Sequence, residues 1–395
     1  MMKNKSTDKS FRTETMLVRG GRDPELTGPF VSPPLVRAST VLFENTAQLC
    51  GRADARFSYG LTNTPTIEAL ASAINDLEDA HGTVLVNSGL AAVSIAIMAA
   101  VRAGDQILVP DNVYGPTRRF CDKTLAKFGV TTTYYDPLIG AGIEKLFSDQ
   151  VGAILMEAPG SHTFEMPDVA AIVNVAKKVG ATTMIDNTWA SPLFFKPVAF
   201  GIDYSIQAGT KYLAGHSDAL IGSISTNQAH WEDLRTTHQN FGVQGGTEEM
   251  FLTLRGMRTM AIRMERQEEN ALTIARWLQE QPEVERVLHP ALPDDPGHAI
   301  WKELIGRSSG LFAFILKDMN DEAAAAMLDH FDIFGLGYSW GGFESLAVLS
   351  QVKHIRSATR WTDAPTIRLS IGLEHPDDLI ADLRAGLDRA KAAMA

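Results

Sequence analysis

One lysine in the sequence has the surroundings of a reactive amine rather than those of a surface charge. Lys211 follows a short strand expected at 204–207 and a turn of small residues, and it precedes a loop with Gly215 and His216. Neighbours of this kind shield a lysine from water, which lowers its pKa and frees the amine to attack a carbonyl group. The spacing of these residues alone is also compatible with an ordinary, exposed lysine at the end of a strand.

Two other segments favour the reactive amine. Asp186 ends an apolar, β-branched run, and a carboxylate there suits the ring nitrogen of a pyridine cofactor. Asn87 to Ala92, which include Gly89 and Leu90, open an apolar helix after an expected strand. Free N–H groups at such a helix start bind phosphate. A lysine, an acid and a phosphate-binding turn together predict pyridoxal 5'-phosphate (PLP), which is held through a lysine amine.

The residues around Lys211 resemble the cofactor-lysine signature of the Cys/Met metabolism family of PLP-dependent enzymes. The matching stretch runs from Ser205 to Asp218, and the resemblance extends from about Arg19 almost to the C-terminus. Within this family, the segments at 338–346 and 367–374 are most similar to those of the bacterial cystathionine β-lyases. The resemblance implies an α/β protein of the PLP-dependent transferase-like fold type I.

The same resemblance implies a carbon–sulfur lyase of methionine biosynthesis and transsulfuration. Such an enzyme cleaves L-cystathionine to homocysteine, pyruvate and ammonia, and it is also expected to act on cysteine and cysteine S-conjugates. Two alternatives stay open: a γ-acting relative (cystathionine γ-lyase, cystathionine γ-synthase or methionine γ-lyase) and a PLP-bound regulator without turnover. Trp340 favours β-elimination, and the presence of Lys211, Asp186 and Arg368 disfavours the regulator.

The resemblance also assigns individual roles. Lys211 and Tyr114 would be catalytic, with the tyrosine stacked on the cofactor ring. The cofactor would be held by Lys211, Asp186, Tyr114, Gly89, Leu90, Thr210, Gly209 and Tyr59, the last from the neighbouring subunit. The substrate would be held by Arg368, Ser339, Trp340 and Tyr59.

Three of these residues also have ordinary alternatives. Tyr114 could be a loop aromatic, Tyr59 a core aromatic and Arg368 a surface charge. However, an arginine in the middle of an apolar strand expected at 366–371 should point into a cavity, where its fork suits an α-carboxylate.

One position departs from the family. Relatives carry an arginine two positions after the tyrosine that matches Tyr59, and this arginine helps to grip the phosphate, whereas the present chain has Leu61. Losing a charge-assisted hydrogen bond calls for compensation. The candidates are the helix-start N–H groups, the Thr210 hydroxyl and the Asn63 side chain.

The order of the expected elements predicts how these residues meet. Strands are expected at 83–86, 106–109, 130–135, 152–157, 181–185 and 203–207, and helices at 67–77, 91–101, 116–128 and 168–179. Such alternation predicts a mostly parallel sheet with helices on both faces. Glu157, Asp186 and Lys211 fall at carboxyl ends of strands, where open α/β sheets bind ligands.

We expect three parts: an extended N-terminal arm (1–60), a PLP-binding large domain (61–256) and a smaller C-terminal α+β domain (257–395). The arm is expected to wrap a neighbouring subunit in a homo-oligomer, a tetramer built as a dimer of dimers with active sites at the dimer interface. Later elements are a long helix at 247–281, strands at 284–288, 311–316 and 366–371, and helices at 322–330 and 376–394.

Composition favours a cytoplasmic, globular enzyme. The net charge of −11 disfavours nucleic acid, and no apolar run is long enough for a membrane span. Cys50 and Cys121 are too few for a disulfide framework, no metal site is expected, and the polar first ten residues do not resemble a signal peptide.

The stretch 306–310 matches a Gly-x-Ser-x-Gly hydrolase pattern by letter, but a helix is expected before it and a strand after it, the wrong context for that motif.

Overall fold

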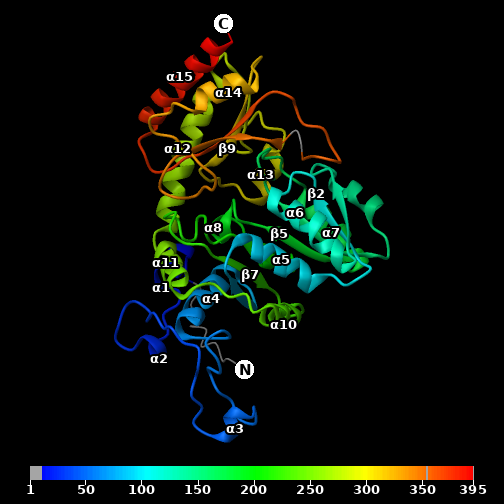
Figure 1. The fold of residues 1–395 in the computed structure, drawn as a ribbon, viewed down its shortest axis with the longest axis vertical. Coiled ribbons are helices and arrows are strands. Elements are labelled where there is room, and N and C mark those ends of the chain that lie inside the picture. Colours follow the sequence, from blue (N-terminus) through cyan, green and yellow to red (C-terminus); the bar gives the residue numbers. More distant parts are fainter. Residues whose placement is uncertain (1–10, 353–354, 395) are drawn as a thin grey trace.

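Two β-sheets, one above the other along the length of the molecule, organise the fold (Figure 1). The computed structural model describes residues 11–352 and 355–394, so the expectation for the first ten residues lies outside the described part. The strand order is β1-β7-β6-β5-β4-β2-β3 in the seven-stranded sheet and β10-β11-β12-β9-β8 in the five-stranded sheet.

The seven-stranded sheet is mostly parallel. Its strands are β1 (Gly82–Val86), β2 (Gln106–Pro110), β3 (Thr131–Tyr135), β4 (Val151–Glu157), β5 (Thr182–Asp186), β6 (Tyr204–Gln207) and β7 (Gly222–Thr226). The pairs β2–β3, β2–β4, β4–β5 and β5–β6 are parallel, whereas β7 runs antiparallel to β1 and to β6. The predicted α/β sheet is confirmed, with one antiparallel strand that was not expected.

Helices accompany this sheet on both faces. They are α4 (Pro65–Glu78), α5 (Gly89–Ala100), α6 (Gly115–Lys123), α7 (Val169–Val179), α8 (Ser191–Phe194), α9 (Pro197–Phe200), α10 (Trp231–Phe241) and α11 (Thr247–Met257), with 3₁₀ turns at Leu125–Phe128 and Gly140–Leu146. In β1, Val84 and Val86 join an apolar cluster with α5, whereas Leu85 joins another with α4 and α11. Successive side chains of a strand point to opposite faces, so a strand that is covered on both sides is apolar throughout.

Two expected helices are wrong in length. The helix predicted at 247–281 is divided into α11 and α12 (Met260–Gln279), and the one predicted at 116–128 into α6 and a 3₁₀ turn. Gly256, near the end of α11, lies so close to the backbone of Ala214 that an added Cβ would overlap its carbonyl oxygen. This contact with the loop after the predicted cofactor lysine is tertiary, so the local sequence pattern does not reveal it.

The five-stranded sheet forms the core of the C-terminal part. It contains β8 (Val284–Leu288), β9 (Leu311–Leu316), β10 (Gly335–Leu336), β11 (Leu346–Ser350) and β12 (Thr366–Ser370), with α12, α13 (His298–Leu304), α14 (Asp321–Leu328) and α15 (Pro376–Ala393) beside it. Strands β10 and β11 were not expected.

Ser308 lies between α13 and β9, so a helix does precede the Gly-x-Ser-x-Gly match and a strand follows it. We keep the boundary at 256/257 as a proposal.

The two sheets share an apolar core. In β9, Phe312 and Phe314 pack with α12, α14 and α15, whereas Ala313 and Ile315 belong to the cluster that contains β4, β5 and α7 of the large sheet. Arg368 of β12 pairs in register with Ala313. Because pairs in register point to the same face, Arg368 is on the face of the small sheet that meets the large domain.

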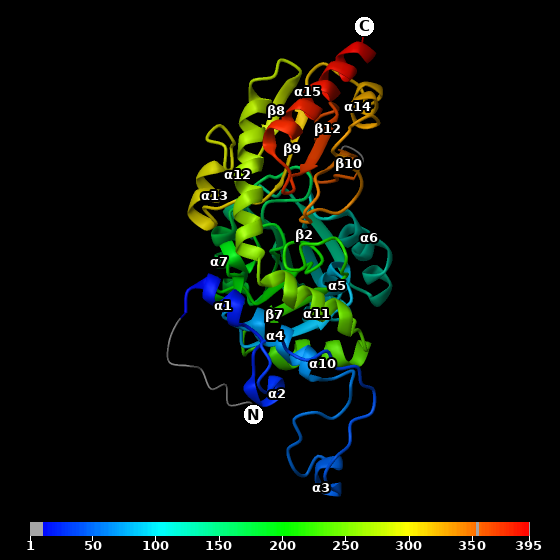
Figure 2. The same cartoon turned by 90° about the vertical axis from the view of Figure 1, so that its left-hand side faces the viewer.

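The N-terminal arm begins against the large domain, where the buried Leu17 packs with α4 and α11, and its later part extends away from both sheets. It carries the short helices α1 (Thr13–Arg19), α2 (Pro24–Thr27) and α3 (Thr46–Leu49), and α3 lies at its far end in both views (Figures 1 and 2). Large apolar side chains on the arm are exposed, among them Phe30, Val31 and Leu42, which is 90% exposed. In the part of the chain that the structure describes, no helix is both long and apolar enough to cross a membrane.

Candidate active site

Lys211 lies just after β6, where residues of both domains converge. Its Nζ donates a hydrogen bond to Ser339 Oγ at 2.5 Å and lies 5.2 Å from the ring centroid of Trp340. Burial, together with the charge of Arg368, lowers the pKa of Lys211 to about 8, with Asp186 acting in the opposite direction. At pH 7 about a tenth of the amine is therefore neutral, far more than for an ordinary lysine.

Two carboxyl groups lie side by side at the ends of β4 and β5. Glu157 and Asp186 are paired in register, and burial raises the pKa of both carboxyl groups. The negative charge of Asp186 raises the pKa of Glu157 further. Asp186 Oδ1 accepts hydrogen bonds from the backbone N–H and the hydroxyl of Thr188 at 3.0 and 2.5 Å. Oδ2 has no hydrogen bond within the described residues. A cationic ring nitrogen beside Oδ2 would stabilise the ionised carboxylate.

The start of α5 packs directly against the turn that leads to Lys211. Ser88 caps the helix by accepting a hydrogen bond from Ala91 N–H at 3.2 Å, while the N–H groups of Gly89 and Leu90 form no hydrogen bond within the described chain. A Cβ added at Gly89 would overlap the Cβ of Ala208, so only glycine fits there. Free helix-start N–H groups next to a lysine are what a phosphate-bearing cofactor needs.

Gly209 and Thr210 shape this turn. A Cβ added at Gly209 would lie 2.8 Å from the Ile221 side chain. The Thr210 hydroxyl donates to the Ile221 carbonyl at 3.1 Å and accepts from its N–H at 3.0 Å. The single proton of the Thr210 hydroxyl is thus used in a hydrogen bond within the chain. The role of Thr210 in binding a phosphate stays a prediction.

Tyr114 stands immediately before α6, beside the acidic pair. Its backbone N–H donates to Glu157 Oε2 at 3.0 Å. Burial and the negative charges of Asp186 and Glu157 raise the pKa of Tyr114, so its phenol stays protonated near neutral pH. Glu157 therefore positions the backbone of Tyr114, a role that its place at a strand end did not reveal.

Arg368 is a buried cation that has no anionic partner in the described part of the chain. Its side chain is 7% exposed, its guanidinium donates to the Ser339 carbonyl at 3.1 Å, and its Nε is buried without a hydrogen bond. It forms no ion pair with any residue that the structure describes. Burial lowers its pKa to about 10, so the charge remains at pH 7. A buried, unpaired guanidinium predicts an anionic ligand, because leaving such a charge uncompensated is costly.

Ser339 connects the two cations, since its hydroxyl contacts Lys211 and its carbonyl contacts Arg368. Its φ of +84° is unusual for a residue with a side chain, and such strain is concentrated at functional sites. The neighbouring Trp340 packs on Tyr212, with ring centroids 5.4 Å apart. The structure thus brings together Lys211, Ser339, Trp340 and Arg368, as predicted for the substrate site.

Tyr59 is not part of this cluster in its own chain. It lies in the arm, is 50% exposed, and has no hydrogen bond or ring contact with Lys211 or Tyr114. The Asn63 amide, one candidate for compensating Leu61, donates to Glu68 at 3.2 Å. The role of Tyr59 from a neighbouring subunit stays a prediction.

Replacing Leu61 by arginine is expected to tighten PLP binding by about 1 kcal/mol, or roughly fivefold in Kd. The reason is a new charge-assisted hydrogen bond to the phosphate, discounted for the partial exposure of this side chain. Titration of the apo-enzyme with PLP measures it, with Leu61→Met as the matched neutral control. Equal or weaker binding by Leu61→Arg would mean that Leu61 does not occupy the arginine's place.

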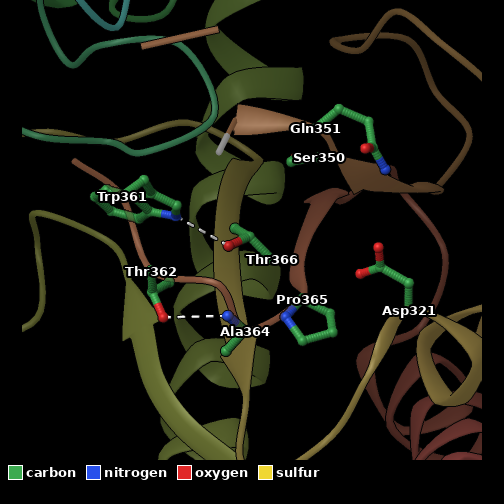
Figure 3. Close-up of a pocket in the computed structure, with 8 residues that line it drawn as sticks. All are labelled: Asp321, Ser350, Gln351, Trp361, Thr362, Ala364, Pro365 and Thr366. Carbon is green, nitrogen blue, oxygen red and sulfur yellow. Dashed lines mark hydrogen bonds between the residues drawn. The ribbon is translucent and has the colours of Figure 1, made fainter. Parts of the chain in front are cut away.

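A small pocket in the C-terminal part contains none of these residues (Figure 3). It is lined by Asp321, Ser350, Gln351, Trp361, Thr362, Ala364, Pro365 and Thr366. Trp361 Nε1 donates to Thr366 Oγ1 at 3.1 Å within it (Figure 3). Its volume of about 10 Å³ has room for a single water molecule, so it is no substrate site.

Comparison with known proteins agrees with this geometry. A family model described as "Cys/Met metabolism PLP-dependent enzyme" matches residues 14–388. A putative cystathionine β-lyase of Rhizobium johnstonii is 49% identical over 96% of both chains, and the cystathionine β-lyase of Escherichia coli is 43% identical over 96% of this chain and 98% of the relative. A crystal structure of cystathionine γ-synthase from Xanthomonas oryzae superimposes with a TM-score of 0.89 at 30% identity, covering 98% of this chain and all of the other.

Proposed function

Because the chain belongs to the Cys/Met metabolism family of PLP-dependent enzymes, we propose that it is a carbon–sulfur β-lyase that cleaves L-cystathionine to homocysteine, pyruvate and ammonia. The family and the fold type I predicted from the sequence are confirmed, and PLP is the cofactor. Relatives named as cystathionine β-lyases at 40–49% identity support the reaction, which belongs to methionine biosynthesis.

The residues around Lys211 fit PLP. Lys211 supplies the amine, Asp186 offers a free carboxylate oxygen for the ring nitrogen, and the start of α5 offers two free N–H groups for the phosphate. When bound, the cofactor supplies an electron sink that no protein side chain provides.

The side chains then bind the substrate and move protons. Arg368 binds the α-carboxylate through its unused donors. The neutral Lys211 amine accepts the proton from the substrate Cα, and the same amine, then protonated, gives a proton to the departing sulfur. Ser339 Oγ at 2.5 Å keeps this amine in place between the two transfers. Tyr114, with its protonated phenol, is available as a further proton donor.

One observation carries the proposal: Ser339 contacts both an amine of lowered pKa and a buried arginine that has no acidic partner among the described residues. A reactive amine beside a guanidinium with unused hydrogen-bond donors is complementary to an α-amino acid, which has a reactive amino group and a carboxylate. A surface lysine or a structural arginine would need neither feature.

A γ-acting lyase is the second candidate, since the γ-synthase structure has the same fold. Trp340 favours the β-lyase, because its ring lies 5.2 Å from the Lys211 amine and restricts the space beside it. A PLP-bound regulator without turnover is the third candidate.

The products of the purified holoenzyme with L-cystathionine distinguish these candidates. We expect pyruvate and homocysteine in equal amounts. Formation of 2-oxobutyrate would instead show cleavage on the γ side, and the absence of both oxoacids would favour the regulator. Cysteine and S-alkyl cysteines, tested in the same pyruvate assay, measure how wide the substrate range is.

We further propose a homotetramer, built as a dimer of dimers, in which the arm of one subunit supplies Tyr59 to the next. Support comes from the exposed apolar side chains of the arm and from the separation of Tyr59 from the Lys211 cluster of its own chain. Light scattering of the purified protein measures the assembly, and a monomeric mass would contradict it.

A cytoplasmic location is proposed as well. Both cysteines are free thiols, with Cys50 exposed and Cys121 buried, which suits a reducing compartment. Fractionation of cells that produce the protein tests this, and recovery from an oxidising compartment would contradict it.

A further inference from the structure

A polar stripe runs along a buried face of α12. It consists of Arg263, Gln267 and Asn270, which are four and three positions apart, so their side chains lie on one face of the helix over two turns. These residues are only 5%, 0% and 2% exposed, respectively. Buried polar groups are costly unless they form hydrogen bonds, so the partners of this polar stripe indicate its role.

Arg263 contacts the turn that carries Lys211. Its Nη2 donates to the carbonyls of Tyr212 and Gly256, both at 2.9 Å. A Cβ added at Gly215, whose φ is +70°, would overlap Arg263 Nη1. Backbone carbonyls thus compensate its charge, and one of them lies in the last turn of α11, where the helix dipole favours a cation. Arg263 therefore holds the backbone directly after Lys211 against the end of α11.

Gln267 contacts the loop that carries Ser339 and Trp340. Its Nε2 donates to the carbonyl of Gly342 at 2.6 Å. Both Gln267 and Gly342 are buried, so bulk water could not replace this donor if the amide were removed. One turn of α12 beyond Arg263, the polar stripe thus holds a second segment of the site.

Asn270 contacts the chain that follows β12, the strand of Arg368. Its Nδ2 donates to the carbonyl of Glu374 at 3.0 Å and to that of Gly372 at 3.5 Å. The three residues of the polar stripe therefore each hold a different segment, and these segments carry the amine, the Ser339 loop and the buried arginine of the candidate site.

We propose that the polar stripe of α12 positions the catalytic amine relative to the substrate-binding groups. This inference rests on the proposed function, in which Lys211 moves protons and Arg368 binds the α-carboxylate. The three contacts follow one another at intervals of about one helical turn, or roughly 5.4 Å, so a single helix supports segments from both sheets. Small displacements of a reacting group cost much of the rate, and such a support prevents them.

The three contacts predict different kinetic effects. In Arg263→Met, kcat is expected to fall about tenfold and the Kd of PLP to rise about fivefold, while KM stays within about twofold, because the turn that it holds carries the amine. In Gln267→Met and in Asn270→Leu, the KM for L-cystathionine is expected to rise about fivefold, while kcat and the Kd of PLP stay within about twofold. Pyruvate kinetics measure kcat and KM, and equilibrium dialysis of the holoenzyme measures the Kd.

Matched controls lie on the exposed side of the same helix. Arg266→Met and Gln279→Met make the same chemical changes at exposed positions and should leave all three constants unchanged. Arg263→Lys, which keeps the charge but loses the planar fork, should give a kcat and a Kd between those of wild type and Arg263→Met. It replaces Arg263→Met in the test if circular dichroism shows that the methionine variant is unfolded. Gln267→Met and Asn270→Leu test the substrate side independently of each other.

Wild-type values of kcat, KM and Kd in all three folded variants would overturn the inference and leave the polar stripe with a purely structural role. An equal fall of kcat in all three, with no change in KM, would overturn it as well. A wild-type enzyme that makes no pyruvate from L-cystathionine would overturn the proposed function, whereas the Kd of PLP in Arg263→Met would still decide whether the polar stripe positions Lys211.

Discussion

Lys211→Ala is expected to reduce the kcat for pyruvate formation at least about a thousand-fold. Two proton transfers depend on this amine, and positioned acid–base groups each contribute about 10²- to 10⁴-fold. Burial lowers the pKa of Lys211 to about 8, and Ser339 holds its Nζ at 2.5 Å, so no other described lysine has the same surroundings. The exposed Lys178 on α7 provides the control, since Lys178→Ala should retain full activity.

Covalent labelling tests the same residue independently of turnover. Borohydride reduces the carbon–nitrogen double bond through which a lysine amine holds PLP, so reduction of the yellow holoenzyme should fix the cofactor permanently. Digestion and mass spectrometry are expected to locate the label on the peptide that contains Lys211. A label on any other lysine would remove the basis of the proposed mechanism.

Arg368→Ala is expected to lower kcat/KM about 10- to 150-fold, chiefly by raising KM. A hydrogen bond between charged groups contributes roughly 1.5–3 kcal/mol, and this arginine is buried with donors that have no protein partner. The colour of the bound cofactor should change little, because the α-carboxylate and not PLP is its ligand. Steady-state kinetics with L-cystathionine provide the measurement.

A lysine variant distinguishes the contribution of the positive charge of Arg368 from that of its two parallel hydrogen-bond donors. Arg368→Lys keeps a cation but loses the two parallel donors, so its KM should lie between those of wild type and Arg368→Ala. Circular dichroism of each variant shows whether the small sheet, where Arg368 pairs with Ala313 and Val348, remains intact. An unchanged KM in folded Arg368→Ala would mean that this arginine is structural.

The sequence alone determined the parts of the site that depend on local pattern. Apolar, β-branched runs identified the ends of β4, β5 and β6, and parallel strands place those ends along one edge. Glu157, Asp186 and Lys211 could therefore be assigned to that edge before any contact was known. The start of α5 followed from a polar, glycine-containing turn before an apolar helix. The position of Arg368 in an apolar strand likewise predicted its inward direction.

Contacts between distant parts of the chain determine which of these residues meet and which of their polar groups are left without a partner. Ser339 and Lys211 are 128 positions apart, and their contact exists because the two sheets share one apolar cluster. The antiparallel β7, and the break between α11 and α12 where Gly256 meets Ala214, also depend on distant partners. Local periodicity has no information about such contacts.

The pairing of arginine side chains is the clearest example of a property that the local sequence does not reveal. The sequence contains many arginines, and nothing in their spacing tells a paired one from an unpaired one. In the folded chain the buried Arg118 is paired with Asp111, whereas Arg368 has no acidic partner among the described residues. The pairing of a side chain depends on every element packed around it. The sequence therefore predicted the role of Arg368, but its lack of an acidic partner could be recognised only after the elements had been brought together in three dimensions.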